Sequence, residues 1–116
     1  MKVCIIGDLE YEKEIDYIKG QLEAIHCIVY VPLYEYRKDH NISNLDINFY
    51  TFEREYIYNS DYILLISEKK HKTFMFNFGI LFGSKKDFKV LSTKNIKNLS
   101  LDKLKEHKTD GKTSGE

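Results

Sequence analysis

Hydrophobic residues are concentrated in short continuous runs that alternate with longer segments of mixed polarity. Residues 3–6, closed by Gly7, residues 26–31 and residues 89–91 are three such runs, and residues 61–66 (DYILLI) give the strongest signal. A short uninterrupted run rich in β-branched residues is typical of a strand buried on both faces of a parallel sheet. The pattern therefore predicts four strands.

The segments between these runs show helical spacing. Asp8 is placed to cap the first helix, and acidic residues follow it at the positive end of the helix dipole. The apolar face of this helix comprises Tyr11, Ile15, Ile18 and Leu22. Residues 46–59 predict a second helix, in which Ile47, Tyr50 and Ile57 are the apolar positions. Residues 73–82 are apolar nearly all round, which predicts a buried helix.

The remaining segments have no clear period. Residues 33–45 follow Pro32 and are polar and aromatic, so we expect a long loop there. A last short helix is predicted at residues 101–106, and residues 107–116 are expected to form a disordered polar tail. A single domain over residues 1–106 is therefore expected.

Alternation of strands and helices defines the predicted architecture. It implies βαβ units with right-handed crossovers, and hence an α/β fold with a doubly wound parallel sheet, flavodoxin-like or Rossmann-like, of four or five strands flanked by helices. Ligands of such folds bind at the carboxyl ends of the strands. Here those ends are residues 7–9, 32–34 and 67–69.

Composition excludes several classes of partner. The 116 residues include 18 basic and 18 acidic side chains, so no net charge attracts nucleic acid or an anionic membrane. No stretch approaches the roughly 18 apolar residues of a membrane helix. Cys4 and Cys27 lie in apolar runs and are expected to be reduced thiols of a cytoplasmic protein. Nothing in the pattern suggests a metal or a cofactor.

Residues 53–91 carry the sequence pattern that is most informative about function. A helix bearing Glu53 leads to a small residue and an aspartate (60–61, SD) that open a strand. The next helix contains residues 77–79 (NFG), and residues 84–86 (SKK) lead into the last strand. This pattern resembles the nucleoside 2-deoxyribosyltransferase family, including its 2′-deoxynucleoside 5′-phosphate N-hydrolase branch. About a third of the chain carries the resemblance closely.

The resemblance implies roles for two residues. In that family a glutamate attacks the anomeric carbon of a 2-deoxyribosyl group, and another acid protonates or orients the leaving base. Such covalent chemistry requires a carboxylate nucleophile. Asn77 stands at the position of the nucleophile, and its amide cannot take that role, whereas Glu53 matches the helix carboxylate. The resemblance therefore implies a catalytically impaired protein that binds a nucleoside, a nucleotide or a related small molecule.

The segment before Asn77 departs from the family in a second way. Family members have glycine or small residues there, whereas this chain has Thr73 and Met75. We expect these bulkier side chains to fill part of the pocket. His71 and Thr73 could instead offer donors to an anion at the start of the helix.

Further candidates lie at the predicted strand ends. The family's first loop contacts the sugar or phosphate, and Asp8 matches it; Tyr34 could stack on a base, or form a lid or dimer contact with Tyr36. Glu68 is a possible substitute carboxylate. The candidate ligand-binding residues are Asp8, Tyr34, His71, Thr73 and Asn77, and the candidate catalytic residues of an active enzyme are Glu53 and Glu68.

Ordinary structural roles compete with these assignments. Asn77 could be a buried amide satisfied by the backbone, and Asp8 a simple helix cap. Glu53 and Glu68 could be solvated carboxylates. His26 is expected to be a core histidine within a strand, and His40 and His107 to be exposed.

Three functions therefore stay open. The first is an impaired deoxyribosyltransferase-like binding protein, and the second is an active N-glycosidase or deoxyribosyltransferase that uses Glu53 or Glu68. The third is a flavodoxin-like or TIR-like interaction module. A dinucleotide-binding role is disfavoured because residues 7–10 (GDLE) lack the G-x-G-x-x-G motif. A homodimer is also possible, because related proteins often complete their pockets across a dimer.

Overall fold

A computed structural model describes residues 1–43 and 45–96. Its centre is a parallel sheet of four strands in the spatial order β2-β1-β3-β4. The strands are β1 (Lys2–Gly7), β2 (Ile28–Tyr30), β3 (Tyr62–Ile66) and β4 (Phe88–Leu91). The predicted doubly wound α/β fold is confirmed.

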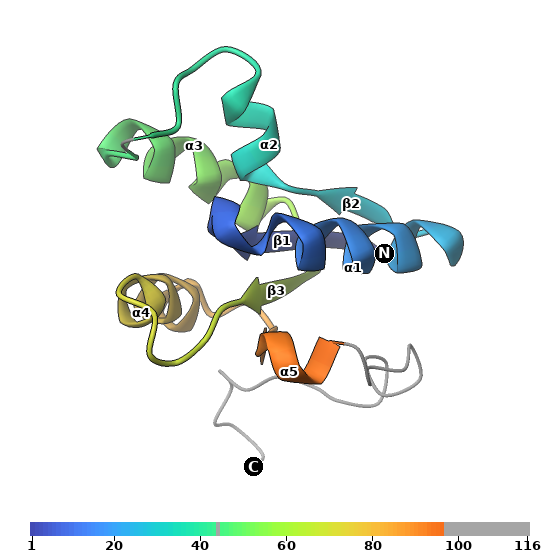
Figure 1. The fold of residues 1–116 in the computed structure, drawn as a ribbon. Helices are drawn as coiled ribbons and strands as arrows, with labels where there is room; N and C mark the ends of the chain where they lie inside the picture. The colour runs from blue at the N-terminus through green and yellow to red at the C-terminus, as the bar shows by residue number, and fades with distance from the viewer. Residues whose placement is uncertain (44, 97–116) are drawn as a thin grey trace.

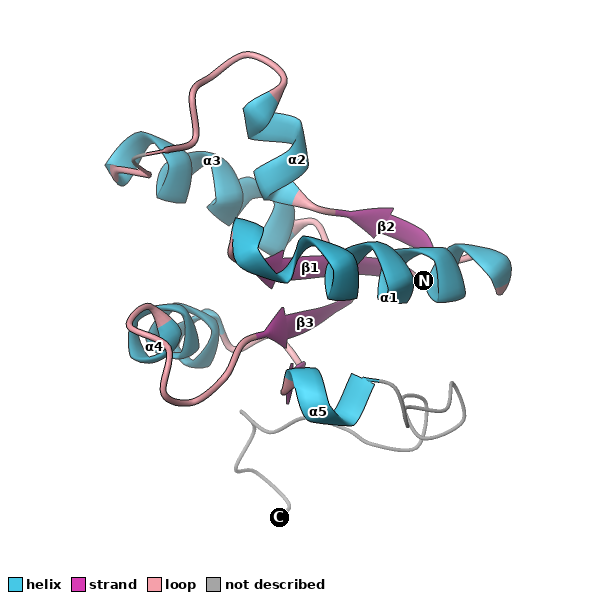
Figure 2. Cartoon of the chain, in the orientation of Figure 1, coloured by secondary structure: helices cyan, strands magenta, loops and turns pink. Residues whose placement is uncertain are grey.

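Helices cover both faces of this sheet (Figures 1 and 2). A 3-10 turn (Leu9–Tyr11) leads from β1 into α1, and α5 follows β4. The helices are α1 (Glu12–Ala24), α2 (Pro32–Arg37), α3 (Ile47–Tyr58), α4 (Phe74–Ser84) and α5 (Thr93–Ile96). In Figure 1, α1 and α5 lie in front of the sheet, on the same side. No helix in the described ranges is long and apolar enough to cross a membrane.

The strands alternate their side chains between two apolar layers. Val3 and Ile5 of β1 pack with Ile15, Ile18 and the rest of the predicted α1 face on one side of the sheet. Cys4 of β1 packs with residues of α3, β3, α4 and β4 on the other side: Ile57, Ile63, Leu65, Phe74, Leu81 and Phe88. Because both sides are covered, the central strands β1 and β3 are apolar and buried over residues 3–6 and 63–66, as the sequence pattern predicted.

Gly7 allows close packing at the end of β1. A Cβ atom added there would lie 3.1 Å from the carbonyl oxygen of Ile66 and 3.2 Å from Cδ1 of Ile15. Only a residue without a side chain lets the start of α1 approach β3 so closely. The glycine thus positions the residue that follows it, Asp8.

The second apolar run is shorter as a strand than predicted. Only residues 28–30 pair with β1, and His26 is exposed in a turn with φ of 68°. The prediction of His26 as a core histidine within a strand is wrong. The turn forms because α1 ends at Ala24 and the chain must reverse before it can enter the sheet; the N–H of His26 donates to the carbonyl of Glu23.

The predicted loop at residues 33–45 begins with a helix, α2, and only the part after Arg37 is irregular in the described residues. Pro32 ends β2 but also begins α2, since its missing N–H costs nothing in a first helical turn. Tyr34 and Tyr36 stabilise this short helix through packing: Tyr34 lies against α1, and Tyr36 stacks on His40 and contacts the rings of Phe49 and Phe52. His40 is exposed, as predicted.

Helix α4 has the predicted position but not the predicted burial. Phe74, Asn77 and Leu81 are buried, whereas Met75, Phe76 and Phe82 are at least half exposed, so the expectation of a helix buried all round is wrong. The second helix also matches its predicted range, although Ile47 is exposed and Phe49 takes its place in the core. The predicted helix at 101–106, the tail at 107–116 and His107 lie outside the described residues.

Candidate functional site

A small cavity lies where β1 ends between α3 and α4. Its volume is about 10 Å³, which is the space of about one water molecule. We call it the inner cavity; its lining residues are Ile6, Gly7, Asp8, Leu45, Phe49, Tyr50, Glu53 and Asn77. Three residues singled out from the sequence, Asp8, Glu53 and Asn77, are thus brought together at the carboxyl end of a central strand.

Two buried polar residues reach the inner cavity from different helices. Glu53 lies on the buried face of α3 and is 4% exposed, and Asn77 lies on the buried face of α4 and is 5% exposed. Each is the only polar member of a buried helical stripe, Phe49–Glu53–Ile57 on α3 and Phe74–Asn77–Leu81 on α4. Apolar neighbours on the same stripe therefore fix both side chains against the sheet.

Burial changes the acidity of Glu53. Removal from water raises its pKa from 4.5 to about 8, and the nearby charge of Asp8 adds to this effect. Both causes disfavour the ionised carboxylate. Glu53 is consequently protonated in most molecules at neutral pH, and it is available as a proton donor rather than as a nucleophile or base.

A larger cleft opens outside the inner cavity. It has a volume of about 460 Å³ and shares Asp8, Leu45 and Tyr50 with the inner cavity. We call it the outer cleft; its remaining lining residues are Leu9, Glu10, Leu33, Ile42, Ser43, His71, Lys72 and Thr73. Ligand-binding clefts commonly measure roughly 300 to 1,000 Å³. Met75 does not fill this space, since its side chain is 72% exposed, so that part of the expectation is wrong.

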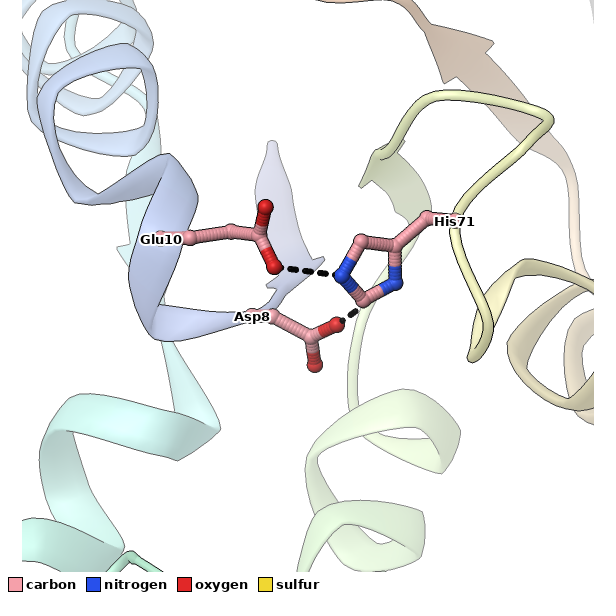
Figure 3. A group of neighbouring side chains, drawn as sticks. All are labelled: Asp8, Glu10 and His71. Carbon is pink, nitrogen blue, oxygen red and sulfur yellow. Dashed lines mark hydrogen bonds and ion pairs between the residues drawn. The ribbon is translucent and has the colours of Figure 1, made fainter.

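Asp8, Glu10 and His71 meet at one wall of the outer cleft (Figure 3). His71 comes from the loop before α4, and its ring points at the carboxylates that follow β1. Its Nδ1 lies 3.2 Å from Oδ2 of Asp8, and its Nε2 contacts Oε1 of Glu10. The hydroxyl of Thr73 donates to Oδ2 of Asp8 at 2.6 Å. Asp8 was predicted to cap a helix, but its side chain makes no capping hydrogen bond and binds the α4 loop instead.

This cluster has the donor set of a divalent metal site. One ligand atom from each of Asp8, Glu10 and His71 lies within 4.8 Å of the others. The Nε2 atom of His71 contacts Glu10, and its Nδ1 atom lies 2.9 Å from the hydroxyl oxygen and 3.2 Å from the backbone nitrogen of Thr73. Both ring nitrogens therefore have partners within the protein. Through these contacts the cluster connects the segment after β1 to the loop before α4.

Two of the predicted site residues lie elsewhere. The hydroxyl of Tyr34 donates to Oδ1 of Asp16 on α1, and the guanidinium of Arg37 lies over its ring. Burial and this bond to Asp16 raise the pKa of Tyr34. Tyr34 is not among the residues that line the inner cavity or the outer cleft.

Glu68 follows the end of β3 and lines neither the inner cavity nor the outer cleft. Its carboxylate accepts the backbone N–H of Thr93 at 2.7 Å and also the hydroxyl of Thr93, and these two bonds lower its pKa. It lines a separate open cleft of about 890 Å³ between the ends of β3 and β4. Within the described residues, Glu68 is therefore a link between β3 and α5.

Sequence reasoning missed two side chains of the site. Glu10 was attributed to the helix dipole, and Tyr50 to an ordinary apolar helix face. The signal for Glu10 was its position two residues after Asp8, at a strand end. No signal in the sequence distinguishes Tyr50 from a core residue, because its role depends on the packing of α3 against α4, where its ring lies 4.7 Å from that of Phe76.

Comparison with known proteins supports the fold. No protein-family model matches the chain, and no curated protein matches it by sequence. A solved structure from a study of the 2-deoxyribosyltransferase of the psychrotolerant bacterium Bacillus psychrosaccharolyticus is similar, with a TM-score of 0.62 and 12% sequence identity over 92% of each chain. At this identity the likeness is one of fold. The chain thus has the α/β fold of a 2-deoxyribosyltransferase.

Proposed function

We propose that this protein binds a nucleoside or a closely related small molecule in the outer cleft and does not cleave its glycosidic bond efficiently. One observation carries the proposal. Asn77 and Glu53 line the same cavity at the carboxyl end of β1. These two residues match the catalytic pair of the deoxyribosyltransferase family that the sequence resembles. The fold shared with a 2-deoxyribosyltransferase supports the nucleoside class of ligand.

The size and lining of the two spaces suggest how the ligand binds. The outer cleft has the volume of a small-molecule site, and Leu9, Leu33 and Ile42 supply apolar surface for a base. The inner cavity admits about one water molecule, so the sugar would stop at its mouth beside Asp8 and Tyr50. A protonated Glu53 behind it would donate a hydrogen bond to this water.

The charges of the outer cleft favour a ligand without a phosphate. Asp8 and Glu10 are acidic, and Lys72 is the only lysine or arginine among the lining residues. His71 and Thr73 were candidates for binding an anion, but their side chains already contact the two carboxylates. We therefore expect a deoxynucleoside to bind more tightly than its monophosphate.

The absence of a carboxylate at position 77 accounts for the proposed impairment. An amide cannot form a glycosyl ester, and loss of a covalent nucleophile costs several orders of magnitude in rate. Hydrolysis by an activated water is the alternative, because the inner cavity has room for one water beside Glu53. Glu53 must ionise to act as its base, so such activity would increase as the pH approaches 8.

Calorimetry and chromatography test the proposal together. We expect deoxynucleosides to bind the wild-type protein measurably and to release no free base beyond the uncatalysed rate between pH 6 and pH 9. Glu53→Gln should keep binding, because glutamine preserves the neutral form, and Glu55→Gln on the exposed side of α3 is the matched control. Turnover by the wild-type protein that Glu53→Gln abolishes and Glu55→Gln retains would refute the proposal that the protein is catalytically impaired. If no nucleoside binds, the proposal that the ligand is a nucleoside is wrong.

Restoration of the carboxylate is a second test. Asn77→Glu should not produce fast turnover, because the new acid shares a cavity of about 10 Å³ with Glu53. Burial and the neighbouring acid would hold its pKa above the usual range and keep it protonated. Base release by Asn77→Glu at the rate of a working N-glycosidase would refute this explanation.

A further inference from the structure

Three side chains that can each bind a metal ion converge at the wall of the outer cleft (Figure 3). Asp8 and Glu10 follow β1, and His71 approaches them from the loop before α4. One ligand atom from each of the three residues lies within 4.8 Å of the other two. His71 is 61 residues from Glu10 along the chain, so the sequence pattern did not indicate a metal.

The contact between His71 and Glu10 requires a hydrogen atom or a cation between the two side chains. Nε2 of His71 faces Oε1 of Glu10, and a carboxylate oxygen is an acceptor only. The other ring nitrogen, Nδ1, lies 2.9 Å from the hydroxyl oxygen of Thr73, whose one hydrogen goes to Oδ2 of Asp8. If Nδ1 carries the ring proton, that hydroxyl oxygen accepts it, and the lone pair of Nε2 points at Glu10. A metal ion can then bridge the two acceptors.

A second arrangement of the same contacts needs no ion. Nδ1 of His71 then accepts the backbone N–H of Thr73, 3.2 Å away, and Nε2 donates its hydrogen to Glu10. The two arrangements differ in which ring nitrogen carries the proton. Binding of a metal ion therefore separates them.

The side chains can reach the geometry of a metal site by a small movement. Zinc binds imidazole nitrogen and carboxylate oxygen at about 2.0 to 2.2 Å, so neighbouring ligand atoms of a tetrahedral site lie roughly 3.3 to 3.6 Å apart. Glu10 must move away from Nε2 to admit the ion, and its side chain is 59% exposed. The side chain of His71 is only 12% exposed, so its ring stays in place while Glu10 rotates.

We propose that Nε2 of His71 and one carboxylate oxygen each of Asp8 and Glu10 bind a zinc ion. Thr73 would hold the imidazole from its other side, since the hydroxyl contacts both Nδ1 of His71 and Asp8. Such outer contacts fix the tautomer and the orientation of a histidine that binds a metal. A set of imidazole and carboxylate donors favours zinc over magnesium, which prefers oxygen ligands alone.

The ion would lie at the wall of the outer cleft, which Asp8, Glu10 and His71 all line. Three protein ligands leave a fourth position for water or for an oxygen atom of a molecule in the cleft. The two positive charges of the ion would offset the charges of Asp8 and Glu10, so a phosphate would be repelled less. This effect on ligand choice rests on the proposed function, whereas the binding of the ion does not.

Isothermal titration calorimetry of EDTA-treated protein with zinc chloride tests the site. In a Cys27→Ser background, which removes the partly exposed thiol, we expect one zinc ion per chain, bound about 100-fold or more tighter than magnesium. His71→Ala and Glu10→Gln should each weaken zinc binding by roughly tenfold or more. His40→Ala and Glu55→Gln are the matched controls, because both residues are exposed and neither lines the cleft. Zinc binding no tighter than magnesium binding, or equal losses in the controls, would overturn the proposal.

Nitrogen-15 NMR of the histidine rings in the wild-type protein makes the test independent of how the variants fold. Zinc should shift the signal of Nε2 of His71 and leave Nδ1 protonated, and the signals of His26 and His40 should stay in place. A signal of His71 that zinc leaves unchanged would mean that Nε2 donates to Glu10, and the proposal would be wrong.

Titrations of a deoxynucleoside and its monophosphate, with and without zinc, test the position of the ion. Zinc should reduce the difference between the two Kd values several-fold, because the ion offsets the acidic charges of the cleft wall. A difference that zinc leaves unchanged would contradict a position at this wall. If neither compound binds, the proposed function fails, and the zinc titration and the NMR spectra still decide whether the ion binds.

Discussion

The buried acid Glu53 makes the stability of the fold depend on pH. Its pKa is 4.5 in an unfolded chain and about 8 in the folded protein. Between these values the unfolded state binds fewer protons than the folded state, so the free energy of unfolding decreases as the pH rises. The decrease begins near pH 4.5 and ends above pH 8. Other carboxylates add their own dependence, and the variant Glu53→Gln isolates this one.

The size of the effect follows from the same two pKa values. Each pKa unit corresponds to about 1.4 kcal/mol, so full ionisation of Glu53 costs the folded state about 4 to 5 kcal/mol as an upper estimate. Glutamine resembles the protonated acid in shape and hydrogen bonding and has no proton to lose. Glu53→Gln should therefore match the wild-type protein near pH 4.5 and exceed its stability by several kcal/mol at pH 8.5.

Urea unfolding at pH 5, 6, 7, 8 and 8.5 measures this difference directly. Glu55→Gln is the control, because Glu55 is exposed on the same helix and its removal changes stability by less than about 0.5 kcal/mol at any pH. Asp8→Asn should lower the pKa of Glu53 and reduce the wild-type decrease, since the charge of Asp8 contributes to that pKa. Parallel curves for the wild-type protein and Glu53→Gln across this range would refute the assignment of a buried, neutral acid.

Two further substitutions test the packing around the strand ends. Gly7→Ala should destabilise the fold by about 1 to 3 kcal/mol, because the new Cβ would lie 3.1 Å from the backbone oxygen of Ile66; urea unfolding measures this loss, and an unchanged midpoint would contradict the close approach. Thr93→Val removes the hydroxyl that donates to Glu68 and should move the pKa of Glu68 up toward its ordinary value. Carboxyl titration by NMR measures that change, and a pKa that stays low would mean that the backbone N–H of Thr93 suffices.

The four strands and the parallel α/β class could be predicted from the sequence because each strand is marked by a local pattern. Each strand is an apolar run, and parallel strands buried on two faces need no alternation of polar residues. The predicted end of β1 also indicated Asp8 as a candidate, and Asp8 lines both the inner cavity and the outer cleft. The same argument failed for residues 26–31, because the left-handed turn at His26 depends on where α1 stops. It also failed for Pro32–Arg37, where contacts with α1 and α3 stabilise a helix too short to have a period of its own.

The site was only partly predictable, since a cavity depends on contacts between distant helices. The resemblance placed Glu53 and Asn77 in one site, and the structure brings them to one cavity. Hydrophobicity alone could not show that Glu68 binds Thr93, or that Tyr34 binds Asp16, because those partners lie 25 and 18 residues away. It also could not show which side of α4 lacks a cover, since both sides are apolar.

Asn77 and Glu53 together explain how a buried polar site persists beside an apolar core. A carboxylate at position 77 would be a third acid in a cavity for one water, beside Glu53 and Asp8, and its charge would raise their pKa values further. An amide at position 77 adds no ionisable group, so Glu53 and the more exposed Asp8 are the acids that line the inner cavity. A glutamate at position 77 would therefore raise the electrostatic cost of the inner cavity, and the amide of Asn77 avoids that cost. Under the proposed function, the amide that excludes a covalent nucleophile would also favour the stability of the fold at neutral pH.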